Sequence, residues 1–162
     1  EDANGDEIEI GILVNSEDTY RKAAADIIKN CLDKLPIHSY IIVKDWSGYT
    51  ADLNAGQFDI YIGGWKIETG YDMRFALQTG KNQIRYSNVE LDSLLDKMES
   101  GIDNKTKLET FIRIKEILND DLPYYCLAYK TYAAVTSKSL QGIVEPYFFD
   151  IYRTSEDWKY VY

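Results

Sequence analysis

Histidine, cysteine and proline are scarce in this chain of 162 residues, which contains one, two and three of them respectively. A serine or cysteine triad needs a histidine base, so any such triad would depend on His38. His38 stands at the expected entrance of a strand, which favours a structural or exposed role. Two cysteines and one histidine cannot form a closed zinc shell without several carboxylates. The sequence therefore predicts no catalytic centre, no metal site and no cofactor.

Phosphate-binding glycine motifs are also missing. The stretch Thr79-Gly80-Lys81-Asn82 lacks both the first glycine and the hydroxyl residue of a phosphate-binding loop. No Gly-x-Gly-x-x-Gly follows the first expected strand. These absences favour a binding protein over an enzyme.

Positive charge and long apolar runs are in short supply. The formal net charge of −9 argues against nucleic acid as a partner, because phosphate contacts need clustered lysine and arginine. No run approaches the roughly 18 apolar residues of a membrane span, and residues 1–7 are acidic and polar, unlike a signal peptide. Cys31 and Cys126 exclude a disulfide framework, and both one bridge and two reduced thiols remain open.

Hydrophobic residues make up 45% of the chain, enough for one domain with a sizeable core. The first half alternates strand-like and helix-like patterns, and Ser16, Pro36 and Gly56 are the expected helix boundaries. The expected elements are a strand over 7–15, a helix over 17–35, a strand over 39–46, a helix over 48–54 and a strand over 58–63. Crossovers of this length join parallel strands, so this half is predicted to be a βαβαβ unit.

The second half is predicted to be mainly helical. A short helix is expected over 73–78, and the capping box Ser87-Asn88-Val89-Glu90 predicts a second helix that ends at Gly101. Asp103 is expected to cap a longer helix that ends near residues 119–121. Residues 124–136 are then expected to form one long strand or two short ones.

The stretch from Phe58 to Asp72 carries the candidate site. An alternating strand runs into Gly63, Gly64 and Trp65, followed by Glu68, Tyr71 and Asp72. Ligands of open α/β sheets bind at the carboxyl ends of strands, so we expect Trp65, Glu68, Tyr71 and Asp72 to contact one. Tyrosine is abundant, with 14 residues, and Tyr86 in a nearby loop is a further ligand candidate. Trp46 is expected to pack in the core.

Several stretches carry a family resemblance in their order and spacing. They are Leu13-Val14-Asn15-Ser16 before the helix with Ala23-Ala24-Ala25-Asp26-Ile27-Ile28, Asp45-Trp46 with Leu53-Asn54-Ala55-Gly56, Phe58-Asp59 through Gly64-Trp65, Tyr86-Ser87-Asn88 with Leu94-Leu95, and Ile117-Leu118-Asn119-Asp120-Asp121-Leu122-Pro123. Together they cover nearly all of the chain, which resembles the bacterial extracellular solute-binding proteins of family 5, the oligopeptide, dipeptide and nickel binding group.

The resemblance implies an α/β fold, namely a type II periplasmic-binding-protein-like lobe with a mainly parallel sheet flanked by helices. Residues 1–162 would form a single domain, one lobe of a larger two-lobed protein, with the tail 144–162 packed on the other lobe. In the family's peptide binders an aspartate three residues after the tryptophan pairs with the peptide's α-amino group, and Glu68 holds that position here. The family's frequent Asp-Pro is replaced by Gly70-Tyr71-Asp72.

The leading functional hypothesis is therefore a non-enzymatic lobe of an ABC-transporter substrate-binding protein that captures a peptide or another amine-bearing solute by hinge closure. The full-length protein would be a monomer outside the cytoplasm, extracellular or periplasmic, anchored as a lipoprotein and partnered with a membrane permease. The alternative is a solute-sensing domain of a cytoplasmic transcriptional regulator. A preceding helix-turn-helix would indicate the regulator, and a signal peptide with a lipid-modified cysteine the receptor.

Overall fold

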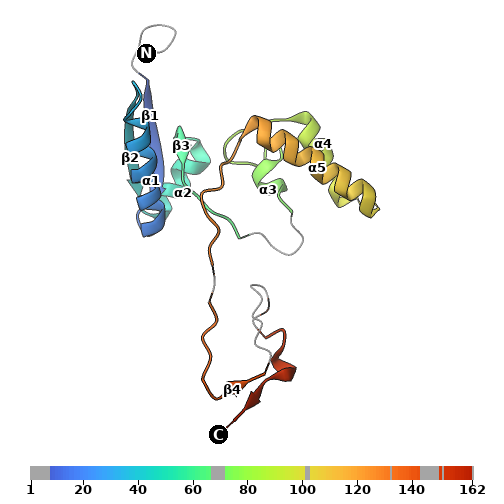
Figure 1. Ribbon diagram of the computed structural model, residues 1–162. Helices are drawn as coiled ribbons and strands as arrows, with labels where there is room; N and C mark the ends of the chain where they lie inside the picture. Colours follow the sequence, from blue (N-terminus) through green and yellow to red (C-terminus); the bar gives the residue numbers. More distant parts are fainter. Residues whose placement is uncertain are drawn as a thin grey trace.

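The computed structural model describes residues 8–66, 72–100, 103–131, 133–142, 150 and 152–161. Its first half is a three-stranded sheet with two helices (Figure 1). The elements are β1 (Glu9–Asn15), α1 (Thr19–Leu32), β2 (His38–Lys44), α2 (Trp46–Ala55) and β3 (Ile60–Tyr61). The strands run parallel in the order β2-β1-β3. The predicted α/β class and βαβαβ unit are confirmed.

The central strand β1 has apolar side chains on both faces. Ile12 and Val14 belong to one buried cluster, with Ala25 of α1. Leu13 points the other way into a second buried cluster, with Tyr49 and Leu53 of α2. Because successive side chains of a strand alternate between faces, α1 and α2 must cover opposite faces of the sheet.

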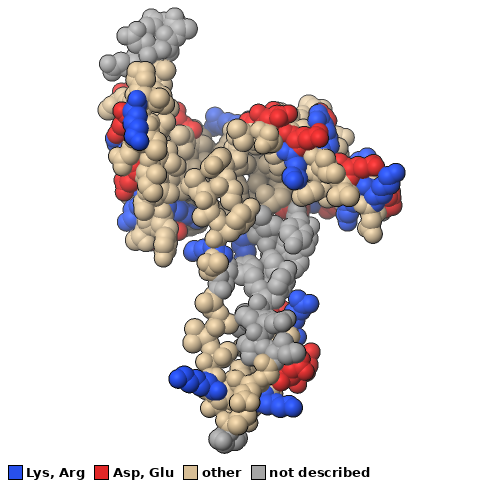
Figure 2. Space-filling view, in the orientation of Figure 1, with Lys and Arg blue, Asp and Glu red and all other residues tan. Residues whose placement is uncertain are grey.

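The second half contributes a separate helical core. Its helices are α3 (Arg74–Leu77), α4 (Val89–Glu99) and α5 (Asn104–Asp121). The buried residues of this core come from all three helices and are Ala76, Leu77, Leu91, Leu95, Ile114 and Ile117. Figure 2 shows charged side chains gathered on the outer surface of α4 and α5. Within the described ranges, no helix is long and apolar enough to cross a membrane.

The chain leaves α5 in an extended segment that leads to a small two-stranded sheet. In this sheet β4 (Leu140–Gln141) pairs antiparallel with β5 (Lys159–Tyr160), and the short 3-10 helix η1 (Ser155–Asp157) precedes β5. The strand predicted over residues 124–136 is wrong for the described residues of that range. An extended segment becomes a strand only by pairing, and this one runs away from the sheet (Figure 1).

Several predicted helix boundaries shift in the structure. The N-cap of α1 is Asp18, not Ser16, because the Asp18 side chain accepts from the backbone N–H groups of Tyr20 and Arg21. The N-cap of α4 is Asn88, not Ser87. Asp103 caps α5 as predicted.

Two further expectations concern cysteine and tryptophan. Cys31 and Cys126 are both free and exposed, so the open alternative of a bridge is excluded in this structure. Trp46 was expected in the core but is 56% exposed, because it begins α2 at the edge of the sheet instead of lying beneath it.

Candidate functional site

The loops after β1 and β2 meet at the carboxyl edge of the sheet and are tied together by Glu17. Its carboxylate accepts the backbone N–H of Trp46 at 2.9 Å and the Asn15 side-chain amide at 3.3 Å. The hydrogen bond from Trp46 lowers the pKa of Glu17. Asn15 is buried, and its oxygen accepts from the Arg21 guanidinium at 2.9 Å. Asp45 caps α2 by accepting from the Gly48 N–H, and Glu17 holds the next residue, Trp46, to the loop after β1.

The chain that leaves β3 passes close to two tyrosines. The Tyr49 hydroxyl donates to the carbonyl of Ile62 at 3.1 Å. A Cβ at Gly63 would lie 2.6 Å from a ring carbon of Tyr61 and 3.2 Å from the Tyr49 hydroxyl. Glycine is needed at 63 for space, so that the backbone can reach Trp65 without displacing Tyr61.

Trp65 lies just beyond these glycines and is 40% exposed. Its ring makes edge-to-face contacts with Tyr124 at 4.7 Å and 87°, and with Phe75 at 5.9 Å and 75°. Tyr61 contacts Tyr124 at 6.4 Å and Phe58 at 5.1 Å. Trp65 thus belongs to an aromatic cluster that joins the strand end to the helical core, with part of the indole left open.

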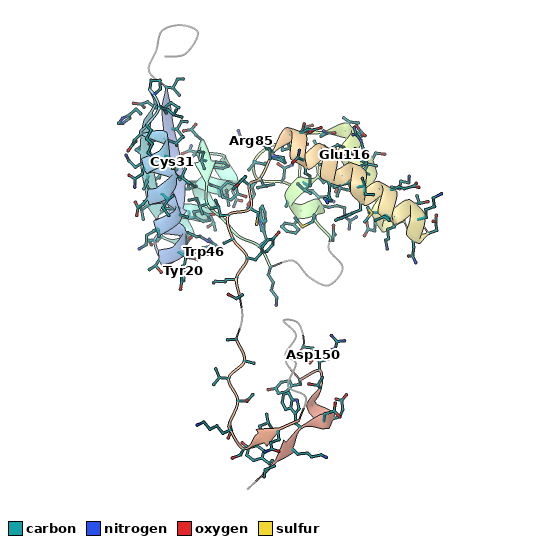
Figure 3. All side chains as sticks on the ribbon, in the orientation of Figure 1. Tyr20, Cys31, Trp46, Arg85, Glu116 and Asp150 are labelled. Carbon is teal, nitrogen blue, oxygen red and sulfur yellow. The ribbon has the colours of Figure 1, made fainter. Side chains whose placement is uncertain are left out.

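Trp46 is a second exposed indole on the same edge, and the sequence reasoning missed it. It stacks on Tyr49 with ring centroids 5.7 Å apart and an interplanar angle of 26°. Figure 3 shows Trp46 and Tyr20, also exposed, at the same end of the sheet. The available signal was the one used for Trp65, since Trp46 directly follows the carboxyl end of a parallel strand.

The Asp72 carboxylate is paired with Arg74 of the same chain. It accepts hydrogen bonds from the Arg74 backbone N–H at 3.0 Å and from the guanidinium at 2.9 and 2.7 Å. These bonds lower the pKa of Asp72 to about 2. Arg74 also pairs with Glu99 at the end of α4. The Asp72 carboxylate therefore anchors the start of α3 against α4.

Tyr86 is likewise engaged, at the junction of α4 and α5. Its hydroxyl donates to the Asp121 carboxylate, which also accepts from the Asn88 amide at 2.9 Å. Its backbone N–H and carbonyl both bond the Asn82 side chain. Burial and the Asp121 hydrogen bond raise the pKa of Tyr86 to about 12. Tyr86 packs on the helical core and makes no described ring contact with Trp65.

Two of the predicted site residues, Glu68 and Tyr71, lie outside the described residues. Over the rest of the chain, no group of three or more histidine, cysteine or acidic side chains could hold a metal ion.

A polar cavity of about 430 Å³ lies elsewhere, between the end of α2 and the loop 79–86, and its lining includes Asn54, Lys81, Arg85 and Tyr86. Arg85 donates to the Ala55 carbonyl at 2.7 Å across it. Because α2 leads into the amino end of β3, this cavity and Trp65 lie at opposite ends of that strand, and Figure 3 shows Arg85 apart from Trp46.

Known proteins resemble this chain in sequence, although no family model matches it. The oligopeptide-binding protein AppA of Bacillus subtilis is 24% identical over 97% of this chain and 30% of its own length. A dipeptide-binding protein of Pseudomonas aeruginosa is 27% identical over 75% of this chain and 24% of its own length. The chain spans less than a third of the length of these curated relatives.

Solved structures of peptide-binding proteins have a similar fold. AppA of Bacillus subtilis, solved in complex with a nonapeptide, matches with a TM-score of 0.73 at 22% identity, over all of this chain and 35% of its own. The fold is that of the periplasmic peptide-binding proteins. A periplasmic oligopeptide-binding protein of Thermotoga maritima matches with a TM-score of 0.66 at 26% identity, over 76% of this chain and 25% of its own. These relatives are peptide-binding proteins, and the likeness favours the receptor hypothesis over the regulator alternative.

Proposed function

We propose that this chain is the ligand-binding lobe of an ABC-transporter substrate-binding protein, which captures a peptide or another small amine-bearing solute. The observation that carries this proposal is the open indole of Trp65 at the carboxyl end of β3, on the edge that also exposes Trp46. An aromatic wall supplies contact area that does not depend on side-chain identity. Such a wall suits a receptor that accepts ligands of varied sequence.

Glu68 is proposed as the anchor for the ligand's amino group. A carboxylate facing an ammonium group gains strength when closure removes the water between them. Tyr71, in the same stretch, is proposed to add contact area. Asp72 and Tyr86 hold α3 and the α4–α5 junction through Arg74 and Asp121, and we propose that they support the site from these positions.

The proposed mechanism is capture without chemistry. A second lobe, encoded in sequence outside this chain, would supply the opposite wall, and the cleft would close around a hinge. The extended segment after α5 and the tail 144–162 are proposed to pack on that lobe. The whole protein would act as a monomer outside the cytoplasm, anchored as a lipoprotein, and deliver its ligand to a membrane permease.

Native mass spectrometry of the full-length protein tests this proposal with a pool of random tripeptides and with the same pool acetylated at the amino terminus. We expect the free pool to bind and the acetylated pool to bind at least about tenfold more weakly, because acetylation removes the charge that Glu68 pairs with. Glu68→Gln should remove this preference. Glu109→Gln, on the exposed face of α5, is the matched control and should keep it. Equal binding of both pools to the unaltered protein would exclude the amine anchor, and binding of neither would exclude the peptide receptor.

A further inference from the structure

Tyr124 makes the shorter of the two described ring contacts to Trp65. Its centroid lies 4.7 Å from that of the indole, against 5.9 Å for Phe75, and the two rings are nearly perpendicular. Such edge-to-face pairs are favourable beyond the area that they bury. Tyr124 therefore restrains the orientation of the indole as well as covering part of it.

Tyr124 also touches both cores of the molecule. It packs against the helical cluster of α3, α4 and α5, and its ring meets Tyr61 at the end of β3 at 6.4 Å. Burial raises the pKa of its hydroxyl. One side chain thus joins the helices to the strand end that presents Trp65.

Leu122 and Pro123 set the direction of the backbone before Tyr124. Leu122 adopts a left-handed conformation with φ 45°, and its N–H closes α5 on the Leu118 carbonyl at 3.1 Å. Pro123 follows and restricts its own φ. The end of α5 therefore directs Tyr124 toward β3.

The side chains become exposed immediately after Tyr124. Tyr125 is 80% exposed and makes no ring contact in the part of the chain that the structure describes. The described residues that follow, up to residue 131 and again over 133–137, form no helix or strand, and the chain leaves the body of the molecule there (Figure 1). Tyr124 is thus the last anchored residue before a segment that leaves the body of the molecule.

We propose that Tyr124 is a positioning residue for the proposed ligand-contacting residue Trp65. It holds the Trp65 indole in place and links it to the start of the segment that follows α5. The inference rests on the proposed function only in giving Trp65 the role of a ligand wall. A ligand-binding protein gains affinity when its contact groups are already ordered before binding. Phe75, in α3, restrains Trp65 on one side, and Tyr124, at the start of the segment after α5, restrains it on another.

The test uses the unliganded chain with Trp46→Phe and Trp158→Phe, which leave Trp65 as the sole tryptophan of the three. Acrylamide quenching and steady-state anisotropy report how firmly the indole is held. We expect Tyr124→Ala to increase the population of undocked indole by about 2- to 10-fold, seen as stronger quenching and lower anisotropy. Tyr124→Phe keeps the ring and should match the parent.

Tyr125→Ala is the matched control, because it removes the neighbouring exposed tyrosine and should leave both signals unchanged. Far-UV circular dichroism checks that each variant is folded. If Tyr124→Ala does not fold, Tyr124→Leu keeps apolar volume without the ring and should give the same loosening. Unchanged quenching in the folded Ala or Leu variant, or an equal increase in Tyr125→Ala, would overturn the proposal. Because no ligand is present, a failure of peptide binding in the full-length protein would not change this result.

Discussion

At the scale of single residues, Gly63 and Gly64 show how neighbours decide what a glycine does. A Cβ at Gly63 would meet the Tyr61 ring at 2.6 Å, whereas at Gly64 the nearest atom is the Arg21 guanidinium at 3.3 Å. A packed ring cannot move aside without disturbing Phe58 and Tyr124, but the tip of an arginine can. The sequence shows two equal glycines, and only the contacts distinguish them.

Gly63→Ala should therefore lower the free energy of unfolding by about 1–3 kcal/mol, the usual cost of overpacking. Gly64→Ala should change it by less than about 0.5 kcal/mol, as for an ordinary surface substitution. Urea denaturation followed by circular dichroism measures both. Equal losses in the two variants would show that the close approach to Tyr61 is not the constraint.

Asp72 provides a prediction about pH at the same scale. Because Arg74 lowers the folded-state pKa of Asp72 to about 2, below the ordinary value near 3.9, its contribution to stability is present above that ordinary value and is lost as the pH falls through about 2. We expect an NMR titration of the Asp72 carboxyl carbon to give a midpoint near 2. Arg74→Gln should move this midpoint towards the ordinary value.

Glu99→Gln is the control for this titration, since it removes the other partner of Arg74 and leaves the bonds to Asp72 in place. The midpoint should then stay low. A midpoint near 3.9 in the unaltered chain would contradict the hydrogen-bonded geometry.

At the scale of elements, the start of α4 shows a local pattern adjusted by a distant partner. The capping box predicted Ser87 as the cap with Glu90 in support, yet the Asn88 side chain accepts the Leu91 N–H at 3.0 Å. Asn88 also donates to Asp121 at the end of α5, and Glu90 pairs with Arg113 of α5. The packing of α4 against α5 therefore decides which residue caps the helix.

Asn88→Ala should lower the free energy of unfolding by about 1–2 kcal/mol, through loss of the cap and of the bond to Asp121. Ser87→Ala should have little effect, because the Ser87 hydroxyl contributes only a 3.3 Å hydrogen bond with Thr79. Thermal and urea unfolding of the two variants give the comparison. A larger loss for Ser87→Ala would restore the predicted capping box.

At the scale of the whole molecule, the described part of the segment after α5 carries exposed apolar side chains. Tyr125, Leu127, Tyr129 and Val135 are exposed. Among the described residues of 124–137, no backbone N–H donates a hydrogen bond. Unpaired extended backbone with exposed apolar residues is a template for strand pairing. A second lobe from a longer polypeptide is the proposed partner.

Hydrogen exchange followed by mass spectrometry tests this placement. In the chain alone, residues 124–137 should exchange at nearly the rate of an unfolded peptide, while β1 stays protected. In the full-length protein the same residues should become protected. Protection of the segment in the chain alone, or its absence in the full-length protein, would contradict pairing with a second lobe.

The sequence by itself determined the order of elements in the βαβαβ unit and the cap at Asp103, because periodicity and capping depend on residues a few positions apart. It also located Trp65 at a strand end. Tertiary structure decided the rest. Glu17, from the loop after β1, accepts the backbone N–H of the exposed Trp46, and Tyr86 pairs with Asp121, 35 residues away. The pair of Asp72 with Arg74, by contrast, is local. Residues 124–136 have strand-like composition, but without a neighbouring strand their described part forms none. Local patterns set which elements form, whereas contacts between distant residues set which side chains stay exposed.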